Sequence, residues 1–273
     1  MVSHANPLQE GTDMFDFKCS MQAQLDNLWL KPEDLARGLD IRVSSVRKWL
    51  DPELDCVPVK DAFDWVYAQT EKLGDLTIQC LNEANGSHEK FGQYILPWYR
   101  DDDLPDTEPV GLHNLASSLV ADQLDAKDME YSFVYACRDD EWIELNLDSF
   151  PDIDPKAEFA AQADILGVPT SEIAMALGIT GRSVKDWKNP KRDDMLPVDD
   201  AWDFLDDFAE KLESRTSELL ESKPDPMPYH PMTRQGTLTL QERIDNQAAL
   251  AASKQIMGDG ESVVDFAYVI DEQ

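Results

Sequence analysis

Basic and hydroxyl side chains gather in two short segments of an otherwise acidic chain. The 273 residues include 24 Lys and Arg against 55 Asp and Glu, for a net charge of −31. Residues 179–192 reverse this balance with five basic residues and one acidic residue, and residues 41–54 hold three basic and two acidic residues. Lysine, arginine, serine and threonine bind phosphate oxygens, and lysine and arginine also bind guanine edges. The chemistry predicted for both segments is therefore contact with double-stranded DNA.

An apolar pattern predicts that residues 172–196 form a helix-turn-helix, which would position these side chains. Ile173 and Leu177 recur at the spacing of one face of a short helix. Gly178 readily adopts the left-handed conformation of a tight turn, and Ile179 is predicted to fill the corner between the helices. A helical pair that only packs within the protein is the alternative.

The second helix of this motif is expected to begin after Thr180, whose hydroxyl can cap its free amide groups. Val184 and Trp187 are three residues apart and would face inward, which leaves the basic side chains facing outward. In a DNA-binding helix-turn-helix this outward face enters the major groove. The residues predicted to contact DNA are Thr180, Arg182, Ser183, Lys185, Lys188, Lys191 and Arg192 in the second segment and Arg42, Ser44, Ser45, Arg47 and Lys48 in the first.

The two basic segments belong to a longer internal repeat. Residues 21–50 align with residues 159–188 at a constant offset of 138, and the match keeps apolar and turn positions together. Asp40 stands where the second copy has Gly178, and aspartate is among the few residues that tolerate positive φ. The sequence therefore predicts a duplicated helix-turn-helix. A first copy that is kept only for packing is the alternative to one that binds DNA.

Each copy continues into a fourth helix and a small β-α-β segment. The expected elements are strands at 94–96 and 130–136 around a helix at 112–124 in the first copy. In the second copy they are a Pro-rich segment at 224–231, a helix at 240–257 and a strand at 262–270.

The predicted fold is α+β, mainly α, with one domain for each repeat. The domains are expected at residues 17–147 and 156–273, joined by an acidic linker at 148–155. Residues 1–16 are expected to form a loose arm.

These motifs resemble those of a known family. They are Val-x-x-Trp in the third helix, Pro-Val-x-x-Ala at the start of the fourth helix and Tyr99-Arg100 near the start of the α/β segment. On them the chain is similar to small bacterial and phage repressors of the anti-CRISPR-associated type, which are related to the phage-repressor helix-turn-helix superfamily. The resemblance covers most of each half. It implies a sequence-specific repressor or regulator that binds DNA through the third helix and dimerises through the α/β segment.

Other site chemistries lack a signal in the sequence. The four cysteines are scattered, with no CxxC pair and no histidine at ligand spacing, so no metal or cofactor site is predicted. No P-loop, Gly-rich dinucleotide turn or nucleophile elbow occurs, and we expect neither an enzyme nor catalytic residues. No apolar run approaches the ~20 residues that cross a bilayer. A cytoplasmic protein without membrane contact is therefore expected.

Together these features predict a transcriptional regulator, acting as a repressor, that binds double-stranded DNA with the third helix of each copy. Two copies in one chain would form an intrachain pseudo-dimer, or two chains a homodimer, on an inverted repeat. The acidity supports a second hypothesis, an acidic protein that mimics DNA and binds a basic protein partner. A surface adapted to high salt is a further explanation for the acidity.

Overall fold

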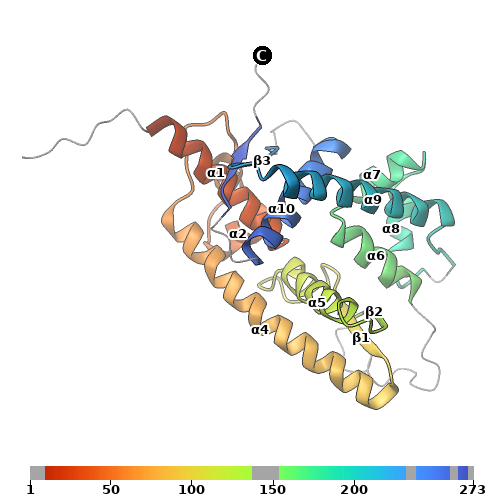
Figure 1. The fold of residues 1–273 in the computed structure, drawn as a ribbon. Helices are drawn as coiled ribbons and strands as arrows, with labels where there is room; N and C mark the ends of the chain where they lie inside the picture. Colours follow the sequence, from red (N-terminus) through yellow and green to blue (C-terminus); the bar gives the residue numbers. More distant parts are fainter. Residues whose placement is uncertain (1–9, 137–153, 193, 232–237, 259–263, 270–273) are drawn as a thin grey trace, which may run out of the picture. The chain divides into compact units, whose positions relative to one another are not determined.

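Helices dominate the described part of the chain, and the strands within it form two short pairs (Figure 1). The computed structural model describes residues 10–136, 154–192, 194–231, 238–258 and 264–269. The helices are α1 Glu10–Asn27, α2 Pro32–Gly38, α3 Val43–Leu50, α4 Lys60–Phe91, α5 Val110–Asp125, α6 Pro155–Ile165, α7 Thr170–Ala176, α8 Gly181–Trp187, α9 Asp199–Ser222 and α10 Leu240–Gly258. The strands are β1 Tyr94–Trp98, β2 Tyr131–Tyr135, β3 Met227–Tyr229 and β4 Phe266–Tyr268. The predicted class, α+β and mainly α, is confirmed.

Each helix-turn-helix is built by local signals in the sequence. Pro32 opens α2, at a position where its missing amide hydrogen costs no helical hydrogen bond. Asp40 and Gly178 take the left-handed conformation in the two turns, with φ of 52° and 64°. At the start of α8 the Thr180 hydroxyl accepts a hydrogen bond from the Ser183 amide at 3.3 Å. The predicted turns and the predicted cap are therefore confirmed.

The inward faces of the third helices are apolar, as predicted, but the isoleucine in each turn is exposed. Val184 is fully buried and Trp187 is 5% exposed, whereas Trp49 in α3 is half-buried. The prediction that Ile179 fills the corner between its helices is wrong, because this residue is 36% exposed, as is Ile41 in the first copy. Spacing along a helix does not define the direction of a side chain once the chain has left that helix.

Both β-α-β segments are parallel pairs with a helical crossover. β1 pairs with β2 so that Trp98 lies opposite Tyr135, and β3 pairs with β4 so that Tyr229 lies opposite Tyr268. Parallel strands need a long connection, which contains α5 in one segment and α10 in the other. β4 is shorter than the strand predicted at 262–270, whose ends lie outside the described residues.

The two segments share a side-chain clamp on the chain that leaves the first strand. Asn114 of α5 accepts a hydrogen bond from the Tyr99 amide at 2.8 Å and donates one to the Tyr99 carbonyl at 2.9 Å. Asn246 of α10 does the same with His230, at 2.6 and 2.9 Å. Because both backbone groups are satisfied by one amide, the clamp fixes each crossover helix against its strand. It also gives the predicted alignment of the copies a shared structural feature.

The chain divides into two compact units that combine elements from both halves of the sequence. The first unit is Met1–Tyr67 with Glu210–Gln273, and the second is Ala68–Ala209. The first therefore joins α1, α2 and α3 to β3, α10 and β4, and the second joins β1, α5 and β2 to α6, α7 and α8. The predicted domains, 17–147 and 156–273, are instead two consecutive segments, one for each half of the sequence. The units differ from them because each helix-turn-helix packs against the β-α-β segment of the other half.

The segments outside the predicted domains also need correction. α1 begins at Glu10, so the prediction of a loose arm is wrong for residues 10–16, and residues 1–9 lie outside the described part of the chain. Most of the predicted linker, residues 148–153, lies outside it as well. Asp154 belongs to the next helix, because its carboxylate caps the first amides of α6.

Candidate nucleic-acid interface

The outward face of α8 is exposed and cationic. The Arg182 side chain is 84% exposed, and Lys185 and Lys191 are also exposed. Val184 and Trp187 occupy the opposite, buried face, which fixes the rotation of the helix about its axis. Arg182 is 4.0 Å from the nearest Asp186 oxygen, a distance at which an exposed ion pair is weak. Arg182 and Lys185, the two central residues of the predicted site, are therefore accessible to a phosphate or a base.

The other four predicted residues of this segment already lie against neighbouring polar groups. The Lys188 ammonium lies 3.1 Å from Asp164, and its side chain is only 17% exposed. Arg192 is 3.9 Å from Asp186 and 3.7 Å from Asp194. The Ser183 hydroxyl lies 3.1 Å from the Thr180 hydroxyl within the cap. A nucleic acid would have to compete for these groups, so Arg182, Lys185 and Lys191 form the accessible part of the predicted site.

The corresponding face of α3 is exposed but less cationic. Arg42, Ser44, Arg47 and Lys48 are exposed and Ser45 is half-buried. The Arg47 guanidinium pairs with Glu33 of α2 at 2.6 Å while its side chain stays 67% exposed. One of the three basic charges of this helix is therefore partly neutralised within the motif, and α3 is the weaker candidate.

A buried lysine and a tyrosine hold the C-terminal end of α8. Lys156 of α6 is only 5% exposed, and its ammonium donates to the carbonyls of Asp186 and Met195. The Tyr135 hydroxyl of β2 donates to the Lys188 carbonyl at 2.6 Å. Carbonyls in the last turn of a helix lack the usual helical partner, and Tyr135 supplies one to the Lys188 carbonyl. The Asp186 carbonyl also accepts a hydrogen bond from the Asn189 amide, so Lys156 adds a second donor there. Burial raises the pKa of Tyr135, which keeps the hydroxyl a donor at neutral pH.

The same arrangement holds the end of α3 in the first unit. Lys18 of α1 is 1% exposed and donates to the carbonyls of Asp51 and Leu54. The Tyr268 hydroxyl of β4 lies 3.2 Å from the Leu50 carbonyl and 2.9 Å from the Gln22 amide oxygen, and its one hydrogen is shared between these acceptors. In both units a strand of the β-α-β segment is thus bonded directly to the candidate recognition helix.

These anchoring residues were missed by the sequence reasoning, although a signal for them exists. Lys18 and Lys156 differ by the same offset of 138 as the helix-turn-helix residues, three positions before the aligned segment begins. Tyr135 and Tyr268 stand at matching places in the final strands, opposite Trp98 and Tyr229. A lysine repeated at one register of an apolar helix is a signal for a buried ammonium that binds backbone carbonyls.

Comparisons with known protein families, curated proteins and solved structures give no match to this chain. Among the described residues, no helix is both long and apolar enough to cross a membrane. No group of three or more His, Cys, Asp or Glu side chains in the same part of the chain is arranged to hold a metal ion.

Proposed function

We propose that the chain is a sequence-specific regulator that binds double-stranded DNA through α8 and α3, acting as a repressor in the cytoplasm. The observation that carries this proposal is the outward face of α8. There Arg182 and Lys185 are exposed on a helix whose opposite face is fixed by buried Val184 and Trp187. A helix presented in this way can enter a major groove and reach guanine edges and phosphates.

The repeat supports a bipartite target. Each helix-turn-helix, each buried lysine and each asparagine clamp has a counterpart in the other half of the sequence. We therefore propose that the chain is an internal duplication of the repressor type that the sequence resembles. Dimeric helix-turn-helix proteins read half-sites about 34–36 Å apart along the duplex. One chain with two such motifs would be a pseudo-dimer on an imperfect inverted repeat. The stronger half-site would be the one read by α8.

Electrostatics sets a condition on this proposal. Phosphate contacts dominate the affinity of proteins for DNA, and each contact makes binding weaker as salt rises. With a net charge of −31, the chain repels a duplex everywhere except near its cationic faces. Binding should therefore be confined to those faces and should depend on the sequence of the duplex.

The direct experiment is selection of bound duplexes from a random pool at 50 mM and 200 mM salt. The proposal expects enrichment of an inverted repeat, with one half-site better defined than the other. Absence of any bound duplex at the lower salt, together with a stable complex between this chain and a basic protein, would instead establish the acidic DNA mimic. The charge of −31 is the observation behind that alternative.

A further inference from the structure

The outward faces of α3 and α8 carry different side chains, although their buried faces agree. At the offset of 138 residues, Val46 lies over Val184 and Trp49 lies over Trp187. The outward pairs at the same offset are Ser44 over Arg182, Arg47 over Lys185 and Lys48 over Asp186. A perfect inverted repeat presents the same bases to both recognition helices, so a protein that reads one needs the same outward face twice. The two copies instead share the residues that hold the helix and differ in those that face away from the protein.

An arginine and a carboxylate share the outward face of α8. Arg182 is the second residue of this helix, in the N-terminal turn that contacts base edges in a helix-turn-helix. Its side chain is 84% exposed, and its Nε atom lies 4.0 Å from the nearest Asp186 oxygen, one turn further along. An arginine binds guanine in the major groove through two nitrogens, which donate to O6 and N7. Since Asp186 is nearest to Nε, it can orient the guanidinium and still leave both terminal nitrogens to a guanine.

The Asp186 carboxylate is itself fixed on this face. Its side chain is 20% exposed and lies 3.9 Å from the Arg192 guanidinium, which follows α8 in the chain. The buried Lys156 ammonium donates to the backbone carbonyl of the same aspartate. A carboxylate held in this way favours the Arg182 rotamers that approach it. An arginine that is ordered before binding loses less conformational entropy in the complex.

The outward face of α3 lacks both members of this pair. Ser44 stands where α8 has the arginine, and a serine hydroxyl bonds to different bases without a strong preference. Lys48 stands where α8 has the carboxylate, so no anion is available there to orient a guanidinium. The arginine of α3, Arg47, lies almost one turn further along and pairs with Glu33 of α2 at 2.6 Å. Its guanidinium is therefore held toward α2, and a guanine contact of this kind is expected from α8 alone.

We propose, as a consequence that rests on the proposed function, that Arg182 reads a guanine in the half-site of α8 and that the half-site of α3 lacks this guanine. Arg182 determines this specificity, and Asp186 is a positioning residue that acts through it. The inverted repeat is then imperfect at a defined base pair. Because its two half-sites are not equivalent, the chain binds the operator in one orientation only.

Replacement of single guanines in the selected duplex tests the contact directly. Each guanine is replaced in turn by 7-deazaguanine, which lacks the N7 acceptor, and the affinity of the full chain is measured at one salt concentration. One guanine, in one half-site, should weaken binding of the parent chain by roughly fivefold or more when it is replaced. Arg182→Ser, which gives α8 the residue that α3 has, should bind the duplexes with and without this replacement equally well.

A graft of the α8 face onto α3 tests the orientation. Ser44→Arg, Arg47→Lys and Lys48→Asp together give α3 the outward side chains of α8. The triple variant should bind a palindrome of two α8 half-sites roughly fivefold or more tightly than the parent chain does, although the graft removes positive charge from α3. The parent chain should prefer the selected operator to this palindrome.

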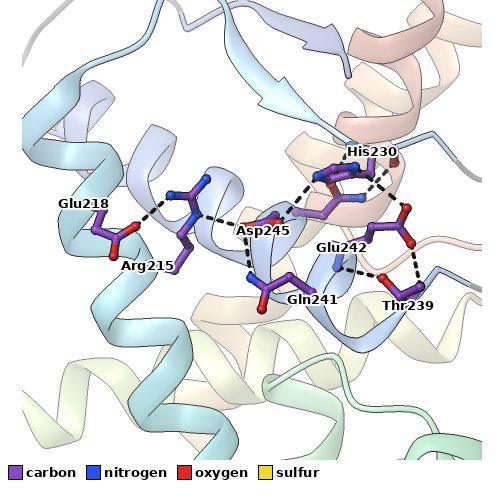
Figure 2. Close-up of polar contacts among 8 residues, drawn as sticks. Arg215, Glu218, His230, Thr239, Gln241, Glu242 and Asp245 are labelled. Carbon is purple, nitrogen blue, oxygen red and sulfur yellow. Dashed lines mark hydrogen bonds and ion pairs between the residues drawn. The ribbon is translucent and has the colours of Figure 1, made fainter. Parts of the chain in front are cut away.

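Asp186→Asn tests the positioning role through a ratio of affinities. It should lower the preference for guanine over 7-deazaguanine by roughly two- to fivefold, the value of an exposed ion pair. Glu218→Gln is the matched control, because Glu218 also lies beside an arginine of its own helix, 2.7 Å from Arg215 of α9 (Figure 2). Each variant removes one negative charge. An effect of charge alone would change the affinity for both duplexes equally, so the ratio should stay unchanged in Glu218→Gln.

Selection of a perfect palindrome would overturn the inference and leave the proposed function standing. The same follows if matching guanines in both half-sites show equal effects, or if Arg182→Ser keeps the full 7-deazaguanine effect. An unchanged ratio in Asp186→Asn would overturn the positioning role. Absence of any bound duplex would instead overturn the proposed function, and the inference with it.

Discussion

Replacement of Tyr135 by phenylalanine removes the hydrogen bond between the β-α-β segment and the candidate recognition helix, α8. Tyr135 is 8% exposed, and the variant keeps its buried ring and removes only the hydroxyl. That hydroxyl donates to the Lys188 carbonyl at 2.6 Å, and the Lys156 carbonyl lies 3.2 Å away. The last turn of α8 therefore loses one of the donors that satisfy its carbonyls.

The expected cost follows from the group left without a partner. A buried acceptor that loses its donor costs about 1–3 kcal/mol, and the partly buried Lys188 carbonyl belongs at the lower end of that range. A cost of about 1–2 kcal/mol in local opening corresponds to a roughly 5- to 30-fold faster amide exchange. The increase should be largest at residues 181–192, because the only other contact that the described residues lose is the longer one to the Lys156 carbonyl in the first turn of α6.

Hydrogen exchange measured by mass spectrometry on peptides that cover residues 181–192 gives this quantity directly. Tyr131→Phe is the control, since that hydroxyl belongs to the same strand but donates to the exposed Asp125 at 3.0 Å. It should change exchange by less than about twofold. Tyr268→Phe should act on α3 and leave α8 unchanged. Equal exchange of α8 in Tyr135→Phe and the parent chain would refute the anchoring role.

Three further predictions concern the pH dependence, the turns and the two units. Burial raises the pKa of Glu158 from 4.5 to about 7, so the urea midpoint should fall as pH rises through this interval, and Glu158→Gln should flatten the change. Gly178→Ala should lower stability by about 1–2 kcal/mol in thermal unfolding because φ is 64° there, whereas Asp40→Gly should not destabilise. A protease site inserted at 145–150 should yield fragments that elute together in gel filtration after cleavage, because each compact unit contains both; separate elution would contradict the division into units.

Local chemistry explains which parts of the fold could be predicted from the sequence. The left-handed turns at Asp40 and Gly178 and the cap at Thr180 each depend on residues no more than five positions apart. Such signals are readable because a turn or a cap is satisfied by its own segment. The strands of the first β-α-β segment, both crossover helices and the last strand were predicted for a similar reason, since each has its own period. The strand β3, Met227–Tyr229, was not predicted, because it lies in a Pro-rich stretch without such a period.

Pairing across the sequence could not be predicted in this way. Tyr268 bonds to Leu50, 218 positions away, and nothing in the period of either segment defines that contact. The exchange of β-α-β segments between the halves, and hence the composition of the compact units, depends on such contacts. In the candidate site, the exposure of Arg182 and Lys185 follows from the helical period, whereas the pairing of Lys188 with Asp164 requires the tertiary structure.

The most direct measurement is the salt dependence of binding to the selected duplex for Arg182→Ala with Lys185→Ala. The control is Lys127→Ala with Lys211→Ala, which removes the same charge from exposed residues outside both third helices. DNA binding through α8 predicts that only the first pair lowers the slope of log K against log salt, by roughly 1.8 for two lost phosphate contacts. It also predicts that preference for the selected sequence is lost with that pair. Equal slopes and equal sequence preference for the two double variants would contradict DNA binding through α8.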